Sequence, residues 1–483
     1  MTSLEPVIYG SDLPSRELRD RLTAGEIPVA VYGLGKMGLP LAGVYAETTG
    51  NVTGVDIDPA VVERLDDGES HVVGEPGLDA LVADQVERGR LAATTDGAAA
   101  AAEAGIHVII VPTLLAEDDS PDLTTVESVV EDVAAGLDPG DLVVAESTLP
   151  PGSCRDVLLP HLVQESGLER GEFGLAFCPE RTASGSALRD IRGRYPKVVG
   201  GVDAASTRAA ELIYGELTSN EVHAVSDATT AEAVKVFEGV YRDVNIALAN
   251  ELGRLADELG ISVREAIDTA NGLSVCQLHE PGPGVGGHCI PYYPHFLLSR
   301  FEEPMPVMRT ARDLNDAMPS VMVDRLADRL AATDAGTDLA DASVLVLGIT
   351  YRAGVEETRA SPALGVVDAL REAGADVAGV DPLVDPAEYG ARPVALEDLP
   401  EESFDGAILV TAHEEFEAIP WPDLEPMVVV DGRDALDLSG TAHSHYTFAG
   451  SHDGSAPLGD GDGSRRSRSE AIEPGRTDGG TDV

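Results

Sequence analysis

Short apolar runs rich in β-branched residues alternate with alanine-rich stretches through the first half of the chain. The apolar runs are typical of buried strands, and the alanine-rich stretches are typical of helices. Their alternation predicts parallel strands joined by crossover helices. The expected strands are residues 29–32, 52–56, 107–111, 142–145 and 174–177.

A different pattern follows between residues 227 and 260, where a single helical periodicity continues for longer than a crossover helix needs. The strand and helix alternation then resumes, with strands expected at 343–347, 377–380, 407–410 and 427–430. We therefore expect an α/β fold with two doubly wound parallel-sheet domains joined by a long central helix and a helical segment. The predicted boundaries are an N-terminal extension (1–25), a first domain (26–222), a central helical domain (223–325), a second domain (326–449) and a tail (450–483).

The tail is rich in glycine, serine, aspartate and arginine, has no periodicity and is expected to be disordered. The whole chain of 483 residues has 33 basic and 85 acidic residues, for a net charge of −52. Acidic residues occur in every segment, which argues against nucleic acid and anionic membranes as partners. Such a surface is typical of a halophilic protein from a high-salt cytoplasm, where salt screens dense carboxylates.

The four cysteines are too few for a disulfide framework and lack metal-ligand spacing, so we expect a reducing compartment and no metal. No apolar leader and no apolar run of membrane-spanning length occurs, which favours a cytoplasmic protein without a membrane partner. Only three lysines are present, namely Lys36, Lys197 and Lys235. Each is worth inspecting, because an ammonium can serve purposes that a guanidinium cannot.

The first expected strand runs into the glycine pattern Gly33-Leu-Gly35-Lys-Met-Gly38. Gly33 permits a tight turn, Gly35 lets a pyrophosphate approach the backbone, and Gly38 allows the following helix to pack closely. Asp56 ends the next strand and can accept from a ribose 2′-hydroxyl, which favours NAD over NADP. The alternative is a glycine turn in an α/β domain that binds no cofactor. The pattern therefore predicts a Rossmann-like domain that binds NAD.

Six motifs in order carry a resemblance to a known family. They are GLGKMGLP (33–40), STLPPGS (147–153), PER (179–181), AEAVK (231–235), GVGGHC (284–289) and TRASP (358–362). Over roughly residues 25–445 the chain resembles the UDP-glucose/GDP-mannose dehydrogenase family. The resemblance implies oxidation of the C6 alcohol of a UDP-sugar to a carboxylate with two NAD in succession. It also implies an NAD-binding first domain, a central dimerisation domain and a second domain that binds the UDP-sugar, giving a homodimer or larger homo-oligomer. The product would be a uronic acid for surface polysaccharide or glycan.

A thiol directly after a glycine-rich loop makes Cys289 the expected nucleophile, because a thiol can add to an aldehyde and carry it to a thioester. The alternative is that Cys289 is a small apolar packing residue, the role that we expect for Cys154, Cys178 and Cys276. The resemblance implies that the Lys235 ammonium stabilises an alkoxide or oxyanion at C6. It also implies that Glu180 is the general base in thioester hydrolysis. It assigns Thr148 to placing a water or the nicotinamide. A solvated lysine and a turn-stabilising threonine are the alternatives.

The remaining candidate residues are expected to bind the cofactor or the substrate. The expected cofactor-binding residues are Gly33, Gly35, Lys36, Met37, Gly38, Asp56, Pro112, Thr113, Ser147 and Thr148. The expected substrate-binding residues are Glu180, Arg181, Lys235, Arg242, Gly284, Gly286, Arg352 and Arg359. Arginine suits a substrate phosphate, although Arg181 and Arg352 could instead form structural ion pairs. His288 is expected to be structural, because adjacent residues rarely face each other.

Two positions depart from the family pattern. Members commonly have an asparagine one helical turn after the lysine and an aspartate four residues after the cysteine, where this chain has Gly239 and Tyr293. One hypothesis is that the tyrosine ring fills the space that the glycine leaves, with its hydroxyl replacing the lost groups. The site would then be slowed or retuned but not inactive. A catalytically weakened nucleotide-sugar binder is the alternative.

The form of the glutamate motif bears on the substrate. Arg181 after Glu180, and the segment 241–251, resemble the N-acetylhexosamine subgroup of the family. The resemblance implies UDP-N-acetyl-D-mannosamine as the substrate, with UDP-glucose as the alternative.

Overall fold

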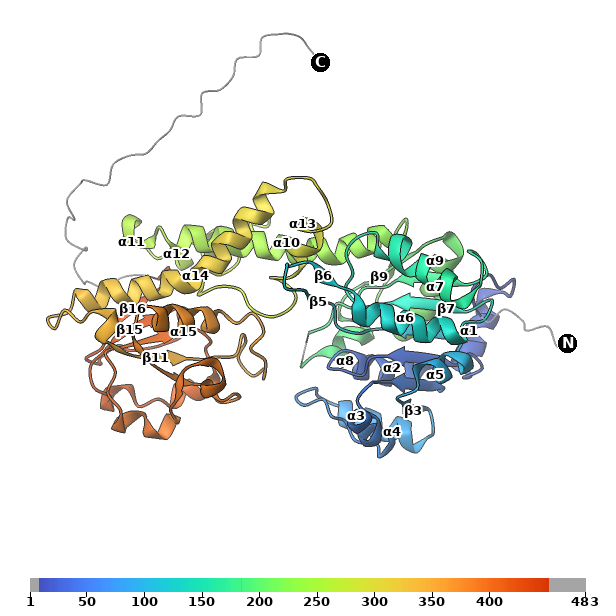
Figure 1. The fold of residues 1–483 in the computed structure, drawn as a ribbon, viewed down its shortest axis with the longest axis horizontal. Coiled ribbons are helices and arrows are strands. Elements are labelled where there is room, and N and C mark those ends of the chain that lie inside the picture. Colours follow the sequence, from blue (N-terminus) through green and yellow to red (C-terminus); the bar gives the residue numbers. More distant parts are fainter. Residues whose placement is uncertain (1–7, 184, 451–483) are drawn as a thin grey trace, which may run out of the picture.

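A computed structural model of the chain describes residues 8–183 and 185–450. It has two α/β lobes, bridged by the long helix α10 (Ala228–Gly253), against which a second long helix, α14 (Pro306–Ala331), packs (Figure 1). Apart from Gly450, the predicted tail 450–483 lies outside the described residues, as do residues 1–7 of the predicted extension. No helix within the described ranges is long and apolar enough to cross a membrane.

The N-terminal lobe contains a sheet of eight strands in the order β10-β9-β8-β7-β4-β1-β2-β3. The strands are β1 (Val29–Tyr32), β2 (Val52–Val55), β3 (Leu91–Thr94), β4 (Ile106–Ile109), β7 (Leu142–Ala145), β8 (Gly174–Phe177), β9 (Lys197–Gly201) and β10 (Val222–Ala224). A separate hairpin pairs β5 (Leu114–Leu115) with β6 (Pro121–Asp122). The five strands predicted in this lobe are all present.

Two strands at one edge of this sheet, β9 and β10, run opposite to the other six. β9 is antiparallel to β8, whereas the other pairs of this sheet are parallel. The connection from β8 to β9 contains only α8 (Ala187–Arg189) and a π-helical turn (Asp190–Arg194). A parallel partner needs a longer crossover connection, usually a full helix. The predicted parallel-sheet fold is thus present, and β9 and β10, which were not among the predicted strands, run against its other strands.

Helices cover both faces of the N-terminal sheet, with separate hydrophobic clusters against each face. They are α1 (Ser15–Thr23), α2 (Gly38–Thr49), α3 (Pro59–Asp66), α4 (Leu78–Glu87), α5 (Gly97–Glu103), α6 (Thr124–Gly136), α7 (Leu159–Ser166) after a π-helical turn (Cys154–Leu158), and α9 (Ala204–Leu217). Helix α1 falls in the predicted N-terminal extension. It buries Leu18 and Leu22 against the lobe, so this part of the extension packs as part of the first domain.

The central segment confirms the predicted long helix but shortens it. α10 (Ala228–Gly253) begins where the Asp227 side chain accepts from the Thr230 amide, and α11 (Ala256–Leu259) follows a break. The other helices are α12 (Val263–Asn271), α13 (Tyr293–Leu298) and α14 (Pro306–Ala331). Buried polar contacts join α10 to α14, where Asn315 Nδ2 donates to Asp243 Oδ1 over 2.9 Å. These contacts hold the bridge between the lobes in one arrangement.

The C-terminal lobe contains a parallel sheet of six strands in the order β13-β12-β11-β14-β15-β16. The strands are β11 (Ser343–Leu347), β12 (Asp376–Val380), β13 (Arg392–Pro393), β14 (Gly406–Leu409), β15 (Val428–Asp431) and β16 (Ser444–Thr447). Helix α15 (Pro362–Glu372) packs with α14 in the hydrophobic cluster on one face. Five 3₁₀ turns complete the lobe, at Leu339–Asp341, Pro386–Tyr389, Leu396–Glu401, Glu414–Ala418 and Trp421–Asp423.

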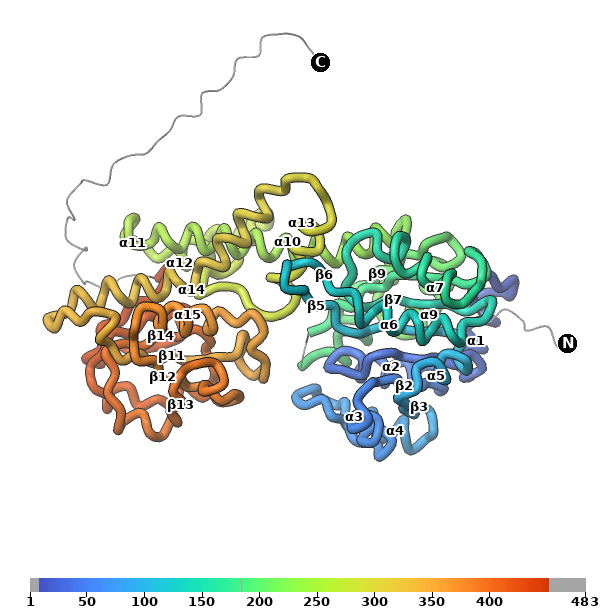
Figure 2. Tube along the Cα trace, viewed as in Figure 1, coloured from blue at the N-terminus to red at the C-terminus, as the bar shows by residue number. Residues whose placement is uncertain are grey.

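The segment between α12 and α13, yellow-green in Figure 2, passes from one lobe towards the other. It contains the glycine-rich loop and Cys289. The fold thus places the predicted nucleophile between the two lobes.

Candidate active site between the lobes

The glycine turn after β1 leaves backbone open to a ligand. Gly33 has a φ of +96°, and a Cβ there would lie 2.6 Å from the Ile110 carbonyl oxygen. A Cβ on Gly38 would overlap the Gly33 carbonyl, so only glycine lets α2 start this close to the turn. A Cβ on Gly35, by contrast, would meet nothing within 4 Å. The open backbone at the N-terminus of α2 fits a pyrophosphate.

Asp56 follows β2 beside this turn. Its Oδ2 accepts from the Leu34 amide over 2.9 Å, and its Oδ1 accepts from the Asp58 amide over 3.0 Å. The side chain is partly exposed, and each carboxylate oxygen can accept more than one hydrogen bond. A ribose hydroxyl can therefore donate to Asp56 without displacing either amide.

The other predicted cofactor residues surround the same edge of the sheet. Ser147 Oγ accepts from the Val111 amide over 2.9 Å and donates to the Val111 carbonyl over 2.7 Å, which joins the ends of β7 and β4. The Thr113 hydroxyl oxygen is buried and has no hydrogen-bond partner among the described residues. Pro112 and Lys36 are exposed. A cofactor lying along this edge would pass all four residues.

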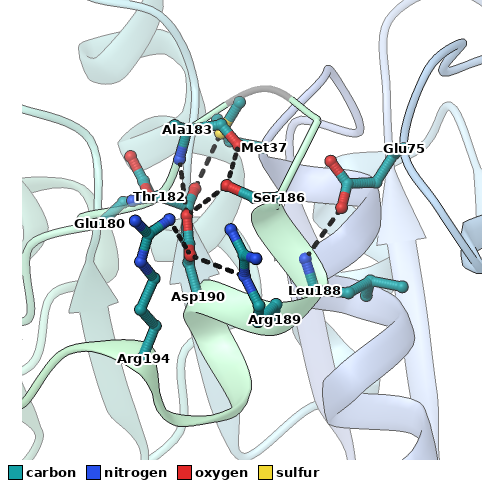
Figure 3. Close-up of polar contacts among 10 residues, drawn as sticks. All are labelled: Met37, Glu75, Glu180, Thr182, Ala183, Ser186, Leu188, Arg189, Asp190 and Arg194. Carbon is teal, nitrogen blue, oxygen red and sulfur yellow. Dashed lines mark hydrogen bonds and ion pairs between the residues drawn. The ribbon is translucent and has the colours of Figure 1, made fainter.

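Met37 connects the glycine turn to the segment after Glu180. Thr182 Oγ1 lies 2.9 Å from the Met37 sulfur (Figure 3). The same segment folds around Asp190, whose carboxylate accepts from Ser186 Oγ over 2.7 Å and lies 3.3 Å from Arg194. These contacts fix Glu180 relative to the cofactor turn.

Lys235 and Glu180 meet at the C-terminal ends of the strands. Lys235, on α10, donates from Nζ to the Glu180 carbonyl oxygen, and Nζ lies 3.9 Å from Glu180 Oε2. Glu180 Oε1 accepts from the Thr182 amide. The Lys235 side chain is only 11% exposed, so it is not a solvated surface lysine.

A buried carboxylate holds α10 against the loop that carries Thr148. Glu232, one turn before Lys235, accepts from the Gly152 amide over 2.5 Å and from the Cys154 amide over 2.7 Å. Burial raises the pKa of Glu232, and the two amides oppose that shift. Thr148 and Lys235 are therefore placed by one shared contact.

Cys289 and Tyr293 complete the group. Cys289 is exposed, and its carbonyl accepts from the Tyr293 amide over 3.0 Å at the start of α13. The Tyr293 hydroxyl lies 3.2 Å from Thr148 Oγ1, and Lys235 Nζ lies 5.8 Å from the centre of the tyrosine ring. Burial raises the pKa of Tyr293 well above its usual value, and the nearby Cys289 side chain raises it further. The structure thus gathers the four predicted catalytic residues around a tyrosine.

The tyrosine ring occupies the space beside Gly239. A Cβ on Gly239 would overlap the Tyr293 ring and lie 3.0 Å from the Tyr293 Cβ. Tyr293 is 7% exposed and packs with Val236, Phe296 and Leu297. The two departures from the family pattern are therefore complementary in shape, as the sequence hypothesis proposed.

The glycines before Cys289 pack closely against residues of the C-terminal lobe. A Cβ on Gly286 would lie 2.6 Å from the Tyr351 Cβ, and one on Gly284 would lie 3.2 Å from Pro362. The Gly287 amide donates to the Arg359 carbonyl over 2.8 Å. The glycine-rich loop therefore packs closely against the second domain at Gly286.

The predicted arginines are spread over the site. Arg181 pairs with Glu238 and donates to the Pro196 carbonyl over 3.0 Å, which fits the structural alternative. Arg242 and Arg352 are exposed. Arg359 lies 3.7 Å from Glu357.

A charged cluster spans the gap between the lobes. Glu357 of the C-terminal lobe lies 3.3 Å from His288 Nδ1. The hydrogen bond from His288 lowers the pKa of Glu357, and the charges of Lys36 and Arg359 lower it further. His288 therefore connects the Cys289 loop to the second domain, in agreement with a structural role.

Sequence reasoning missed a buried group behind Glu180. Lys197 Nζ lies 2.6 Å from Glu146 Oε2, and the Tyr214 hydroxyl donates to the other oxygen of Glu146. Burial raises the pKa of Glu146, while the Lys197 charge opposes the shift. Glu146 and Lys197 line a pocket together with Glu180 and Met37. The signals were the rarity of lysine and the position of Glu146 directly before Ser147.

The described residues contain no group of three or more histidine, cysteine, aspartate and glutamate side chains able to hold a metal ion.

Comparison with known proteins defines the class of this site. Three domain models of the UDP-glucose/GDP-mannose dehydrogenase family match the chain: the NAD binding domain over residues 27–218, the central domain over 229–317 and the UDP binding domain over 345–438. The chain belongs to this family and is an NAD-dependent nucleotide-sugar dehydrogenase.

Individual relatives agree with this class. The chain is 35% identical over 415 residues to a UDP-N-acetyl-D-mannosamine dehydrogenase from Pyrococcus horikoshii, covering 84% of this chain and 96% of that protein. It is also 35% identical to an NDP-N-acetyl-D-galactosaminuronic acid dehydrogenase from Ralstonia solanacearum, covering 84% and 95%. The solved structure of the Pyrococcus UDP-D-ManNAc dehydrogenase superposes with a TM-score of 0.80 at 33% identity, covering 88% of this chain and 99% of that one. A UDP-glucose dehydrogenase from Pyrobaculum islandicum gives a TM-score of 0.77 at 28% identity, covering 87% and 96%.

Proposed function

We propose that the protein oxidises the C6 hydroxyl of a UDP-sugar to a carboxylate in two successive steps, with UDP-N-acetyl-D-mannosamine as the substrate. The observation that carries this proposal is the meeting of Cys289, Thr148, Lys235 and Glu180 between the lobes, beside the cofactor turn. The relatives that act on UDP-N-acetyl-D-mannosamine support the choice of sugar.

The first step converts the alcohol to an aldehyde. The Gly33–Gly38 turn and Asp56 would hold NAD, which would supply a hydride acceptor for C6 in each oxidation. The Lys235 ammonium stabilises the negative charge that develops on the C6 oxygen as its proton leaves. Its contact with the Glu180 carbonyl holds the ammonium in place.

The second step needs the thiol. The Cys289 sulfur forms a bond to the aldehyde carbon, and the former carbonyl oxygen becomes the oxyanion of a thiohemiacetal. Loss of a hydride from C6, for which a second NAD would be the acceptor, converts the thiohemiacetal to a thioester. Glu180 takes a proton from water, the water oxygen bonds to the carbonyl carbon, and the carbon–sulfur bond breaks to release the uronic acid.

Two alternatives make different predictions. UDP-glucose could be the substrate, since a relative of similar fold is a UDP-glucose dehydrogenase. A nucleotide-sugar binder with little activity is the other alternative, because Gly239 and Tyr293 replace the usual amide and carboxylate.

The test is to count NADH per sugar. The purified protein would be incubated with NAD and a panel of UDP-sugars in concentrated KCl, because its 85 acidic residues call for screening. Two NADH for each UDP-N-acetyl-D-mannosamine would support the proposal. Two NADH only with UDP-glucose would favour UDP-glucose as the substrate. Binding of a UDP-sugar without NADH production would favour a nucleotide-sugar binder.

The nucleophile is tested by Cys289→Ser, with Cys276→Ser as the matched control because Cys276 is also not fully buried. Cys289→Ser should abolish the second NADH, whereas Cys276→Ser should retain both. Retention of the second NADH in Cys289→Ser would refute the assignment of the nucleophile.

We also propose a homodimer or larger homo-oligomer formed through α10. Phe237 and Tyr241 lie one turn apart on this helix and are 57% and 50% exposed. Large apolar side chains exposed together often mark an interface. Sedimentation of the wild type and of a Phe237→Glu, Tyr241→Glu double variant checks this. A monomeric wild type would contradict it.

A further inference from the structure

The Tyr293 hydroxyl lies where the reacting atoms must meet. It is 3.2 Å from Thr148 Oγ1, and the Cys289 side chain is near enough to raise the pKa of Tyr293. A hydroxyl has one donor and two acceptor positions. When Thr148 donates to it, the tyrosine hydrogen is free to point towards the sulfur and any atom bonded to the sulfur.

The ring is held firmly enough to place this hydroxyl. It is wedged against Gly239 and packs with Val236 and Phe296, and only 7% of Tyr293 is exposed. The Tyr293 amide also donates to the Cys289 carbonyl over 3.0 Å. The hydroxyl and the sulfur therefore belong to one turn of chain whose geometry is set by packing.

We infer that Tyr293 is a catalytic residue that donates a hydrogen bond from its hydroxyl to the C6 oxygen while C6 is bonded to the Cys289 sulfur. The inference rests on the proposed function, which places an aldehyde at Cys289. Tyr293 takes the place of the asparagine and aspartate that this chain lacks, and Gly239 makes room for the larger ring.

The tyrosine transfers no proton in this step. As the sulfur–carbon bond forms, the electron pair of the carbonyl π bond moves to oxygen, and the tyrosine hydrogen bond to that oxygen strengthens. When C6 is oxidised to the thioester, the oxygen lone pair re-forms the carbonyl and the hydrogen bond weakens again. Burial keeps the pKa of Tyr293 well above its usual value, so the hydroxyl remains a donor at neutral pH.

Tyr293→Phe tests the hydroxyl without emptying the space beside Gly239. Loss of one oxyanion donor typically lowers the rate about 10²–10³-fold. We expect kcat for oxidation of the separately supplied UDP-sugar aldehyde to fall about 10²-fold with little change in KM. Oxidation of the alcohol should fall by less, so about one NADH per sugar should appear before the reaction slows. Tyr292→Phe, one residue earlier, is the control and should keep two NADH.

The result that would overturn the inference is a Tyr293→Phe protein that oxidises the aldehyde at the wild-type rate. An equal fall in both oxidations would also overturn it, since that result indicates a general structural role. Thermal unfolding of both variants checks that the fold is retained.

A second readout does not depend on turnover. The rate at which iodoacetamide alkylates Cys289 at fixed pH should fall severalfold in Tyr293→Phe, because a donor to the thiolate is lost. If the wild type makes no NADH with any UDP-sugar, the proposed function fails. An unchanged alkylation rate then also refutes the contact between Tyr293 and Cys289.

Gly239→Ala offers a further check on the role of the ring. Its Cβ would overlap the Tyr293 ring and displace the hydroxyl without removing it. We expect slower aldehyde oxidation, and no additional loss when Tyr293→Phe is combined with it, because both act on one interaction. Additive losses would contradict a shared role.

Discussion

The two lobes contain the same strand–glycine turn, one after β1 and one after β11. Gly33 and Gly348 both have positive φ, at +96° and +85°. The Gly33 amide donates to the last residue of β2 over 2.8 Å, and the Gly348 amide donates to the last residue of β12 over 2.9 Å. An aspartate then follows each second strand and accepts from the amide after the glycine.

The two aspartates differ in what else they contact. Asp56 accepts from two backbone amides and remains partly exposed. The Asp381 side chain is fully buried, accepts from the Thr350 amide over 2.9 Å, and lies 3.2 Å from His413 Nε2. A carboxylate whose acceptor positions are filled by its own domain cannot serve a ribose. The comparison explains why the same turn can bind a dinucleotide in one lobe and stabilise the other.

The chain after each turn differs as well. Gly38 is the first residue of α2, whereas the 13 residues 349–361 separate Gly348 from the start of α15 at Pro362. Within that loop Tyr351 packs against Gly286 and Gly287. The second turn thus supports the Cys289 loop, and its helix N-terminus is not presented to a dinucleotide.

The largest expected effect is on stability. Asp381→Asn should lower the free energy of unfolding by about 3 kcal/mol, because breaking a buried charge network leaves its partners unpaired. The matched Asp56→Asn should change it by less than about 1 kcal/mol. Denaturant unfolding of both variants in concentrated KCl measures the difference. Equal losses would mean that the two carboxylates have the same role.

The next largest effect is a pH dependence of the unfolding free energy that arises from Asp381 in the second lobe. Burial opposes ionisation of Asp381, but His413 and the backbone amides outweigh it and lower its pKa to about 2. Because the folded-state pKa lies below the unfolded value, this stabilisation is complete above about pH 4 and is lost as the pH falls towards 2. About 2 kcal/mol should disappear over this window. The difference in unfolding free energy between wild type and Asp381→Asn should shrink correspondingly, and a constant difference would contradict the assignment.

Removing the charge of the other aspartate should act on the cofactor. Asp56→Asn replaces a charged acceptor by a neutral one, which should weaken NAD binding about tenfold, or about 1.4 kcal/mol. The affinity for NADP should rise relative to that for NAD, because the carboxylate no longer repels a 2′-phosphate. Titration calorimetry with both cofactors checks this. An unchanged ratio of the two affinities would show that Asp56 does not face the ribose.

Much of the fold was predictable because its strands are short buried apolar runs. The predicted strands in both lobes are present, whereas β3, β9, β10, β13 and β16 of the two sheets were not predicted. All of these but β9 are short or partly exposed. The direction of β9 was not predictable from periodicity, because it depends on how the connection from β8 folds.

The site was predictable where a motif carried it and unpredictable where distant residues meet. Cys289, Lys235, Glu180 and Thr148 came from motifs, and the fit of Tyr293 to Gly239 could be suspected because both positions depart from the family. The buried group around Glu146 was missed despite the rarity of lysine, because Lys197 and Tyr214 are 51 and 68 residues away from Glu146 along the chain.

The smallest expected effect on stability separates the two glycine segments. Gly35→Ala should change the free energy of unfolding by less than about 0.5 kcal/mol, because its Cβ would meet nothing within 4 Å. It should nevertheless weaken NAD binding severalfold, since a methyl group would stand where the pyrophosphate approaches the backbone. Gly286→Ala is the matched comparison, because its Cβ would lie 2.6 Å from the Tyr351 Cβ and should destabilise the fold by about 1–3 kcal/mol. The unfolding free energy and the NAD affinity of both variants test whether NAD occupies the open space at Gly35. An unaffected NAD affinity in Gly35→Ala would place the cofactor elsewhere.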